Sequence, residues 1–259
     1  MKHIILWFCL TLTTGTTFAQ QEGRMETDRP DQTESPYLTK KKWIQAEVGF
    51  NIERDKSLKT VVHPTALIKY GAGKRFEFRL ITTWVSEEAP ATSGKGSYYE
   101  SGLLPVQLGG KILLAEEKGL LPKTSVIFHV APSKLGSKKF HYDKWAPNFR
   151  FVMQNTLSKT VGLGYNLGAE WDGFSNTPSW IYTFAPGFNI GKKWYGYVEA
   201  FGSLKTNEKP EHALDAGIAY YFNDDNKIDL SSGFALSENA TDWYGAIGFS
   251  FRFNTRKKK

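Results

Sequence analysis

Hydrophobic residues alternate with polar or small residues in one segment after another between residues 41 and 254. In the segment 44–53, Ile44 and Phe50 belong to an apolar phase, whereas Glu47 and Glu53 belong to a polar phase. A period of two residues is typical of β-strands, because successive side chains point to opposite faces. Segments of about ten residues have the length that a tilted strand needs to cross a bilayer. The pattern therefore predicts an all-β fold.

Twelve such segments follow one another, and their connections differ in length. The segments are 42–54, 60–71, 74–86, 102–116, 122–132, 147–157, 160–172, 178–190, 193–204, 211–222, 226–236 and 242–254. The second, sixth, eighth and tenth connections are short, whereas the third, fifth and seventh are longer. Short periplasmic turns and longer outer loops are typical of outer-membrane barrels. The sequence predicts a single transmembrane antiparallel β-barrel of about 12 strands over residues 41–254, with both termini in the periplasm.

A soluble β-sandwich would alternate in the same way, so the aromatic residues have to discriminate between the two folds. Tryptophans of the apolar phase lie at strand ends beside the odd-numbered connections: Trp84, Trp171, Trp180 and Trp243. The opposite strand ends carry Tyr70, Phe76, Phe188, Trp194 and Phe253. Two aromatic levels that bracket an aliphatic band are typical of a membrane barrel. We therefore expect the barrel.

The first 19 residues resemble a secretory signal peptide. A short basic start precedes an apolar run from Ile4 to Leu12, and Ala19 ends a small-residue cleavage site. The only cysteine of the chain, Cys9, lies in this segment. We expect export to the outer membrane of a Gram-negative cell. The exported chain would consist of an N-terminal segment over residues 20–40, the barrel over 41–254 and a basic tail over 255–259.

Charged residues within the predicted strands mostly keep to the polar phase, which would face the barrel interior. An Arg or Lys on the lipid face would cost about 2–4 kcal/mol at the bilayer midplane. The candidate pore-lining residues are Glu47, Lys69, Glu77, Arg79, Lys111, Arg150, Glu170, Glu199, Asp215, Asp229 and Arg252. They could line a narrow, selective, porin-like solute path, or they could form ion pairs that only stiffen the wall. Both interpretations stay open.

Three parts of the sequence resemble a known family. The stretch 25–36 and the pattern Gln45-x-Glu47-x-Gly49 resemble the opening of outer-membrane transporters of the "meta-pathway of phenol degradation" type. The stretch 109–116 and the closing segments 229–234 and 248–253 resemble the same family. The resemblance implies passage of a small solute, with aromatic compounds and organic acids as candidates. The word phenol describes a genetic context and does not identify a substrate.

The N-terminal segment has no alternation of its own, yet the family resemblance is strongest there. Its charged residues Asp28, Arg29 and Asp31 are candidates for a plug. Arg29 could pair with Glu47 or Glu77, and Asp28 or Asp31 could pair with Arg79 or Arg252. We expect the segment to fold back into the periplasmic mouth of the barrel. The alternative is a disordered periplasmic tail.

Other function classes have less support in the sequence. A serine hydrolase needs a histidine beside a serine, and the only histidines after the signal peptide are His63, His129, His141 and His212. None belongs to a recognisable catalytic motif, so we predict no enzymatic activity, no metal and no cofactor. The expected partners are outer-membrane lipid and an unidentified small solute. The net charge of +7 is too small an excess to indicate binding to nucleic acid. A structural barrel without transport and a lipid hydrolase are the alternatives, and the oligomeric state stays open.

Overall fold

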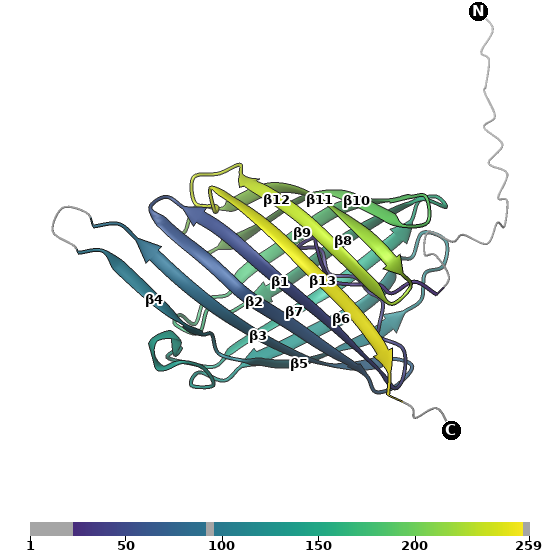
Figure 1. Ribbon diagram of the computed structural model, residues 1–259, viewed down its shortest axis with the longest axis horizontal. Coiled ribbons are helices and arrows are strands. Elements are labelled where there is room, and N and C mark those ends of the chain that lie inside the picture. The colour runs from purple at the N-terminus through teal and green to yellow at the C-terminus, as the bar shows by residue number, and fades with distance from the viewer. Residues whose placement is uncertain (1–22, 92–95, 256–259) are drawn as a thin grey trace, which may run out of the picture.

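The computed structural model describes residues 23–91 and 96–255, which form one closed antiparallel β-barrel (Figure 1). The predicted signal peptide and tail residues 256–259 lie outside the described residues. A short 3₁₀ helix, η1 (Lys138–Phe140), lies in the loop between β6 and β7. The strands are β1 (Trp43–Asp55), β2 (Leu58–Gly71), β3 (Phe76–Ala89), β4 (Tyr98–Leu103), β5 (Gln107–Ala115), β6 (Lys123–Ala131), β7 (Ala146–Thr156), β8 (Val161–Glu170), β9 (Ser179–Ile190), β10 (Trp194–Lys205), β11 (Glu211–Asn223), β12 (Asn226–Ala235) and β13 (Trp243–Asn254).

The wall has twelve strands because β4 and β5 together form one of them. Both pair with β3: Leu103 of β4 lies opposite Trp84, and Ile112 of β5 lies opposite Phe76. Pro105 lies between β4 and β5, and a proline cannot donate a hydrogen bond to a strand ladder. Pairing of β1 with β13 closes the barrel. The prediction of a single antiparallel barrel of about 12 strands is confirmed.

The barrel is apolar outside and charged inside. Phe78, Leu167 and Trp180 are 55%, 56% and 55% exposed, whereas Glu47 and Lys111 are completely buried. Soluble proteins show the opposite distribution, because they bury apolar side chains and solvate charges. An exposed apolar band around a polar interior is typical of a barrel in lipid. Among the described residues, no helix is long and apolar enough to cross a membrane.

The predicted third connection, from Glu87 to Gly102, is wrong at both ends. Strand β3 continues to Ala89 and β4 already begins at Tyr98, so the two strands extend beyond their neighbours (Figure 1). Glu87 lies opposite Glu100 across the two strands, and the Tyr98 hydroxyl donates to Glu87 at 3.2 Å. Carboxylates and exposed tyrosines are mixed on both faces of this extension, so apolar and polar side chains do not alternate along it. Alternation therefore fails to mark it as strand.

Candidate functional site

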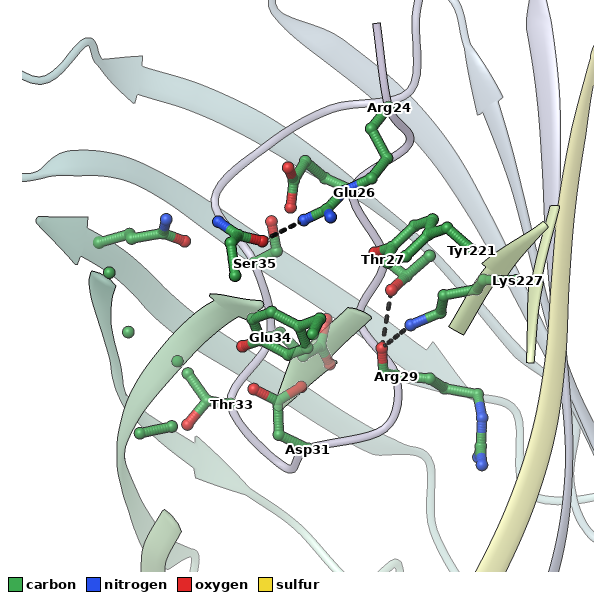
Figure 2. Close-up of a pocket in the computed structure, with 17 residues that line it drawn as sticks. Arg24, Glu26, Thr27, Arg29, Asp31, Thr33, Glu34, Ser35, Tyr221 and Lys227 are labelled. Carbon is green, nitrogen blue, oxygen red and sulfur yellow. Dashed lines mark hydrogen bonds between the residues drawn. The ribbon is translucent and has the colours of Figure 1, made fainter. Parts of the chain in front are cut away.

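Residues 23–40, which we call the inner segment, enter the barrel and return to the same end. At the entrance, the backbone N–H of Met25 donates to the carbonyl of Asp224 in the β11–β12 turn at 2.9 Å. A turn at residues 31–33 meets Glu199 in the middle of β10. The segment ends where Trp43 N–H donates to the carbonyl of Lys40 at 2.9 Å. Figure 2 shows this course, with Arg24 and Asp31 at opposite ends of the view.

Asp28 fixes the inner segment to the wall formed by β2, β3 and β5. Its carboxylate lies 2.8 Å from Lys69 Nζ, 2.8 Å from Arg79 Nη1 and 3.0 Å from Lys111 Nζ. Burial alone would raise the pKa of Asp28, but the cations of Lys111, Lys69 and Arg79 hold it well below its usual range. A buried charge is tolerated only when opposite charges compensate it. Asp28 is therefore an ionised anchor.

Carboxylates of the wall also accept hydrogen bonds from the backbone of the inner segment. Glu47 accepts from the N–H groups of Asp28 at 2.9 Å and Arg29 at 3.1 Å, and Glu77 accepts from Thr39 at 2.6 Å. An irregular segment inside a barrel has no strand ladder to satisfy its amides, so other acceptors must do so. Glu47 and Glu77 satisfy these three.

Arg29 forms a second anchor on the opposite side, against β12. Its Nη2 lies 3.0 Å from Asp229 Oδ1. The guanidinium lies against glycines of β1 and β13, because a Cβ at Gly49 would lie 2.2 Å from Arg29 Nη1 and one at Gly248 would lie 2.3 Å from Nε. Glycine at these two positions therefore allows the arginine to approach the wall.

The turn of the inner segment is attached to β9 and β10 by hydrogen bonds to a hydroxyl and to a carboxyl group. The Thr33 hydroxyl lies 2.6 Å from the Thr183 hydroxyl and donates to Glu199 Oε1 at 2.5 Å. The backbone N–H of Gln32 donates to Glu199 Oε2 at 2.7 Å. On the far side, Arg150 Nη1 donates to the carbonyl of Gln32 at 3.2 Å. The turn thus depends on hydrogen bonds rather than on ion pairs of its own side chains.

Acidic side chains surround this turn. Asp215 lies opposite Glu199 across the β10–β11 pair and accepts hydrogen bonds from the hydroxyls of Tyr197 and Tyr244. Burial raises the pKa of Asp31, on the turn itself, to about 8. Among the described residues, none of Asp31, Glu199 and Asp215 forms a salt bridge. Negative charge here is therefore poorly compensated.

The returning half of the inner segment is bound to β3, β5, β6 and β8. Glu34 lies 2.7 Å from Arg79 Nη2, and its backbone N–H donates to Asn166 Oδ1 at 2.7 Å. Lys111 Nζ donates to the carbonyl of Ser35 at 2.6 Å, and the Ser125 hydroxyl donates to the carbonyl of Pro36 at 2.7 Å. Ion pairs and buried hydrogen bonds therefore fix the returning half in place.

Cavities remain on both sides of the inner segment. An outer cavity of about 280 Å³ lies above the turn and includes Gln32, Arg150, Thr183 and Tyr244. An inner cavity of about 60 Å³ is bounded by the inner segment, β12 and the wall from β7 to β11 (Figure 2). A side cavity of about 370 Å³ lies beside Glu34 and His129. The interior is narrow but not filled.

The candidate residues of the wall point into this network. The buried ones are Glu47, Lys69, Glu77, Arg79, Lys111, Glu199, Asp215, Asp229 and Arg252. Arg150 and Glu170 pair with each other beside the outer and side cavities. No group of three or more His, Cys, Asp or Glu side chains within residues 23–91 and 96–255 is arranged to hold a metal ion.

Several predicted contacts differ from those observed. Asp28 pairs with Arg79 as expected, but the Arg29 guanidinium pairs with Asp229 instead of Glu47 or Glu77. Arg252 pairs with Asp225 and not with Asp28 or Asp31. Strict alternation with Lys69 would turn His63 inward, but His63 is exposed beside a β-bulge of β2, and its Nε2 lies 2.8 Å from Ser86 Oγ. The bulge shifts the register by a residue, which turns a side chain to the other face.

Sequence reasoning missed several residues that bind the inner segment. Thr33, Thr183 and Asn166 are uncharged, so a search for charged residues of the polar phase cannot find them. Lys227 is buried and donates to the carbonyl of Arg29, but it follows a turn at the very start of β12. The inward phase of each strand, including its hydroxyl and amide residues, is the signal that could have found them.

Known proteins were compared with this chain by sequence and by structure. No curated protein matches the sequence at a significant level. The COG4313 outer membrane channel from Pseudomonas putida F1 superimposes with a TM-score of 0.65 and 10% identity over 86% of this chain and 99% of that one. The KdgM porin in complex with disordered oligogalacturonate has a TM-score of 0.54 and 10% identity over 82% and 99% of the two chains. The NanC porin has a TM-score of 0.53 and 9% identity over 80% and 98%.

These structural similarities show the fold of an outer-membrane barrel. The sequence comparison identifies the family directly, because residues 27–253 match the family described as "Putative MetA-pathway of phenol degradation". The match begins within the inner segment, one residue before Asp28, and ends in β13. The inner segment and the barrel wall are therefore parts of one family pattern, and this chain belongs to that family.

Proposed function

We propose that this outer-membrane barrel is a narrow channel for small solutes and that its inner segment acts as a plug. The observation that carries the proposal is the pair of cavities above and below the turn at residues 31–33. The interior of an eight-stranded barrel is filled by side chains, whereas a barrel of sixteen or more strands encloses an aqueous channel. The interior of a twelve-stranded barrel has a width between these two cases. A movable segment in such an interior would control whether the two cavities connect.

The charged interior supports a channel over a purely structural barrel. Buried ion pairs contribute little stability relative to well-packed apolar residues of similar volume. A barrel that only reinforced the membrane could therefore be filled with apolar side chains. Here Lys69, Lys111 and Arg79 are instead buried among carboxylates. A polar interior provides hydrogen-bonding partners for water and for a solute that crosses the barrel.

A lipid hydrolase has weaker support. The structurally similar proteins are described as channels and porins. On the barrel exterior His63 lies beside Ser86, but the Ser86 hydroxyl donates to Ser101 Oγ at 2.8 Å. Within the described part of the chain, no carboxylate is bonded to His63 to orient its ring. We therefore assign no catalytic role to this pair.

The orientation follows the usual barrel arrangement. The short turns, the entrance of the inner segment and both ends of the barrel domain would lie in the periplasm, and the longer loops would lie outside the cell. The inner segment would then plug the barrel from the periplasmic side. A disordered periplasmic tail has less support, because residues 28–36 are held by ion pairs and buried hydrogen bonds.

Planar-bilayer recordings of the refolded protein test the proposal. We expect small, brief current steps from the complete mature chain and larger steps from a variant that lacks residues 22–36. Circular dichroism and heat-dependent gel mobility would show that both proteins form the barrel. A correctly folded deletion variant that carries no current would contradict the channel, and one with the wild-type conductance would contradict the plug.

A further inference from the structure

Three cavities lie in series along the wall formed by β8 to β11. The outer cavity reaches the wall at Thr183, and the inner cavity continues along it. A mouth cavity of about 390 Å³, beside Lys192 and Lys193 of the β9–β10 turn, shares Arg24 and Tyr221 with the inner cavity. This side of the barrel therefore has almost continuous free space from the outer cavity to the short turns.

Small residues on the inward phase create the middle part of this space. Gly162 and Gly164 of β8 and Ala185 and Gly187 of β9 line the inner cavity. A Cβ at Gly164 would lie 2.9 Å from Thr33 Cγ2, so even one methyl group there would press on the turn. The small residues thus leave the inner cavity free of side chains, and at Gly164 the missing side chain lets the turn pack closely against the wall.

Four residues that are joined by hydrogen bonds lie between the outer and inner cavities. We call this group the latch, and its members are Gln32, Thr33, Thr183 and Glu199. Thr33 faces the inner cavity, whereas Gln32 and Thr183 face the outer cavity. The bonds of the latch join two hydroxyls, one backbone amide and one carboxylate. Each hydrogen bond of this kind contributes only modestly to stability, and more when one group is charged.

The opposite side of the inner segment is attached much more firmly. Asp28 contacts three cations there, and Glu34 pairs with Arg79. The side cavity on that face is bounded by Glu34, whereas the backbone of Glu34 is bonded across the barrel to Asn166 of β8. Opening a path on that side would require separation of several buried ion pairs, which costs far more than breaking the latch.

We infer that solutes cross the barrel between the inner segment and the β8–β11 wall, and that the latch is the gate on this route. The inference rests on the proposed channel function. Movement of the turn away from Thr183 and Glu199 would join the outer and inner cavities, while Asp28 keeps the segment in the barrel. A passing solute would exchange hydrogen bonds with the acceptor groups of the latch, which suits solutes that carry hydroxyl or amino groups.

A reversible crosslink tests the gate directly. The Thr33 and Thr183 hydroxyl oxygens are 2.6 Å apart, and the sole cysteine of the chain, Cys9, lies in the predicted signal peptide. The double variant Thr33→Cys with Thr183→Cys, refolded without residues 1–19, should lose nearly all potassium chloride conductance on oxidation. A reducing agent should restore it, and mass spectrometry would verify the disulfide. An oxidised, disulfide-linked protein that conducts like the reduced one would overturn the gate.

A matched pair of single variants tests the side on which the route lies. Thr183→Val and Ser125→Ala each remove one hydroxyl that bonds to the inner segment, on opposite walls. Thr183→Val should raise the ratio of open to closed time about fivefold, as expected for one lost hydrogen bond, and Ser125→Ala should leave it near wild type. Equal opening by both variants would mean that the whole segment leaves and would overturn the route. If the deletion variant conducts while Thr183→Val behaves as wild type, the latch fails but the channel stands.

Discussion

Asp28 lies 51 positions before Arg79 in the chain, and its carboxylate is 2.8 Å from the Arg79 guanidinium inside the barrel. Each charge is buried and compensated by several partners: Asp28 also contacts Lys69 and Lys111, and Arg79 also contacts Glu34 and Glu77. This pair connects a segment that precedes the barrel to the third strand of the wall. The position of the inner segment and the chemistry of the wall therefore depend on each other.

Replacement of Asp28 by Asn should release the inner segment. The variant leaves Lys69, Arg79 and Lys111 with less negative charge around them, and loss of one partner from a buried pair costs about 3–5 kcal/mol. We expect larger conductance and faster tryptic cleavage at Arg24 in the folded barrel. Glu238→Gln is the control, because the exposed pair of Lys209 with Glu238 should contribute almost nothing. Protection of Arg24 from trypsin equal to wild type in Asp28→Asn would contradict the anchor role.

Two glycines of neighbouring strands should respond differently to alanine. At Gly49 the new Cβ would lie 2.2 Å from Arg29 Nη1, whereas at Gly245 no atom lies within 4 Å. Because a guanidinium ends a flexible side chain, Gly49→Ala should displace Arg29 from Asp229 without preventing barrel formation. We expect increased conductance from Gly49→Ala and wild-type conductance from Gly245→Ala. Identical single-channel records from the two variants would show that the position of Arg29 does not affect the plug.

The conductance should increase with pH. Burial raises the pKa of Asp31 to about 8, whereas in a released segment it would return to about 3.9. The docked turn favours the protonated form of Asp31, so this contribution to its stability is fully present below about pH 4. The contribution is lost as the pH rises through about 8 and Asp31 ionises. Glu199, Asp215 and Asp28 add negative charge around Asp31, and Lys227 adds positive charge. Recordings between pH 5 and 9 should show more opening at alkaline pH, with a weaker trend in Asp31→Asn. A trend of opposite sign would refute this assignment.

Thiol labelling of whole cells should establish the orientation. Lys209 lies in the β10–β11 loop and Leu120 in the β5–β6 turn, and their side chains are 70% and 97% exposed. Lys209→Cys should react with an impermeant maleimide on intact cells, and Leu120→Cys should react only after the outer membrane is permeabilised. The reverse pattern would place the short turns outside.

The strands of the wall could be predicted from the sequence almost residue by residue. The segments predicted at 178–190, 193–204 and 211–222 are observed at 179–190, 194–205 and 211–223. Alternation succeeds because one face of each strand is exposed to lipid and the other to a polar interior, so the two environments select opposite residue types at every step. Where both faces meet water, as in the extension of β3 and β4, the pattern disappears and the prediction failed.

The inner segment shows what the sequence leaves undecided. The sequence identifies its charged residues as candidates for pairing. It does not predict that Arg29 pairs with Asp229, or that Thr33 contacts Thr183, which lies 150 positions later in the chain. A two-residue period specifies only which face a side chain occupies. Which inward side chains meet across the interior depends on the closure, tilt and stagger of all twelve strands. The amino-acid sequence by itself thus determined the strands and their polarity, whereas only the closed barrel decided which residues hold the inner segment and where free space remains beside it.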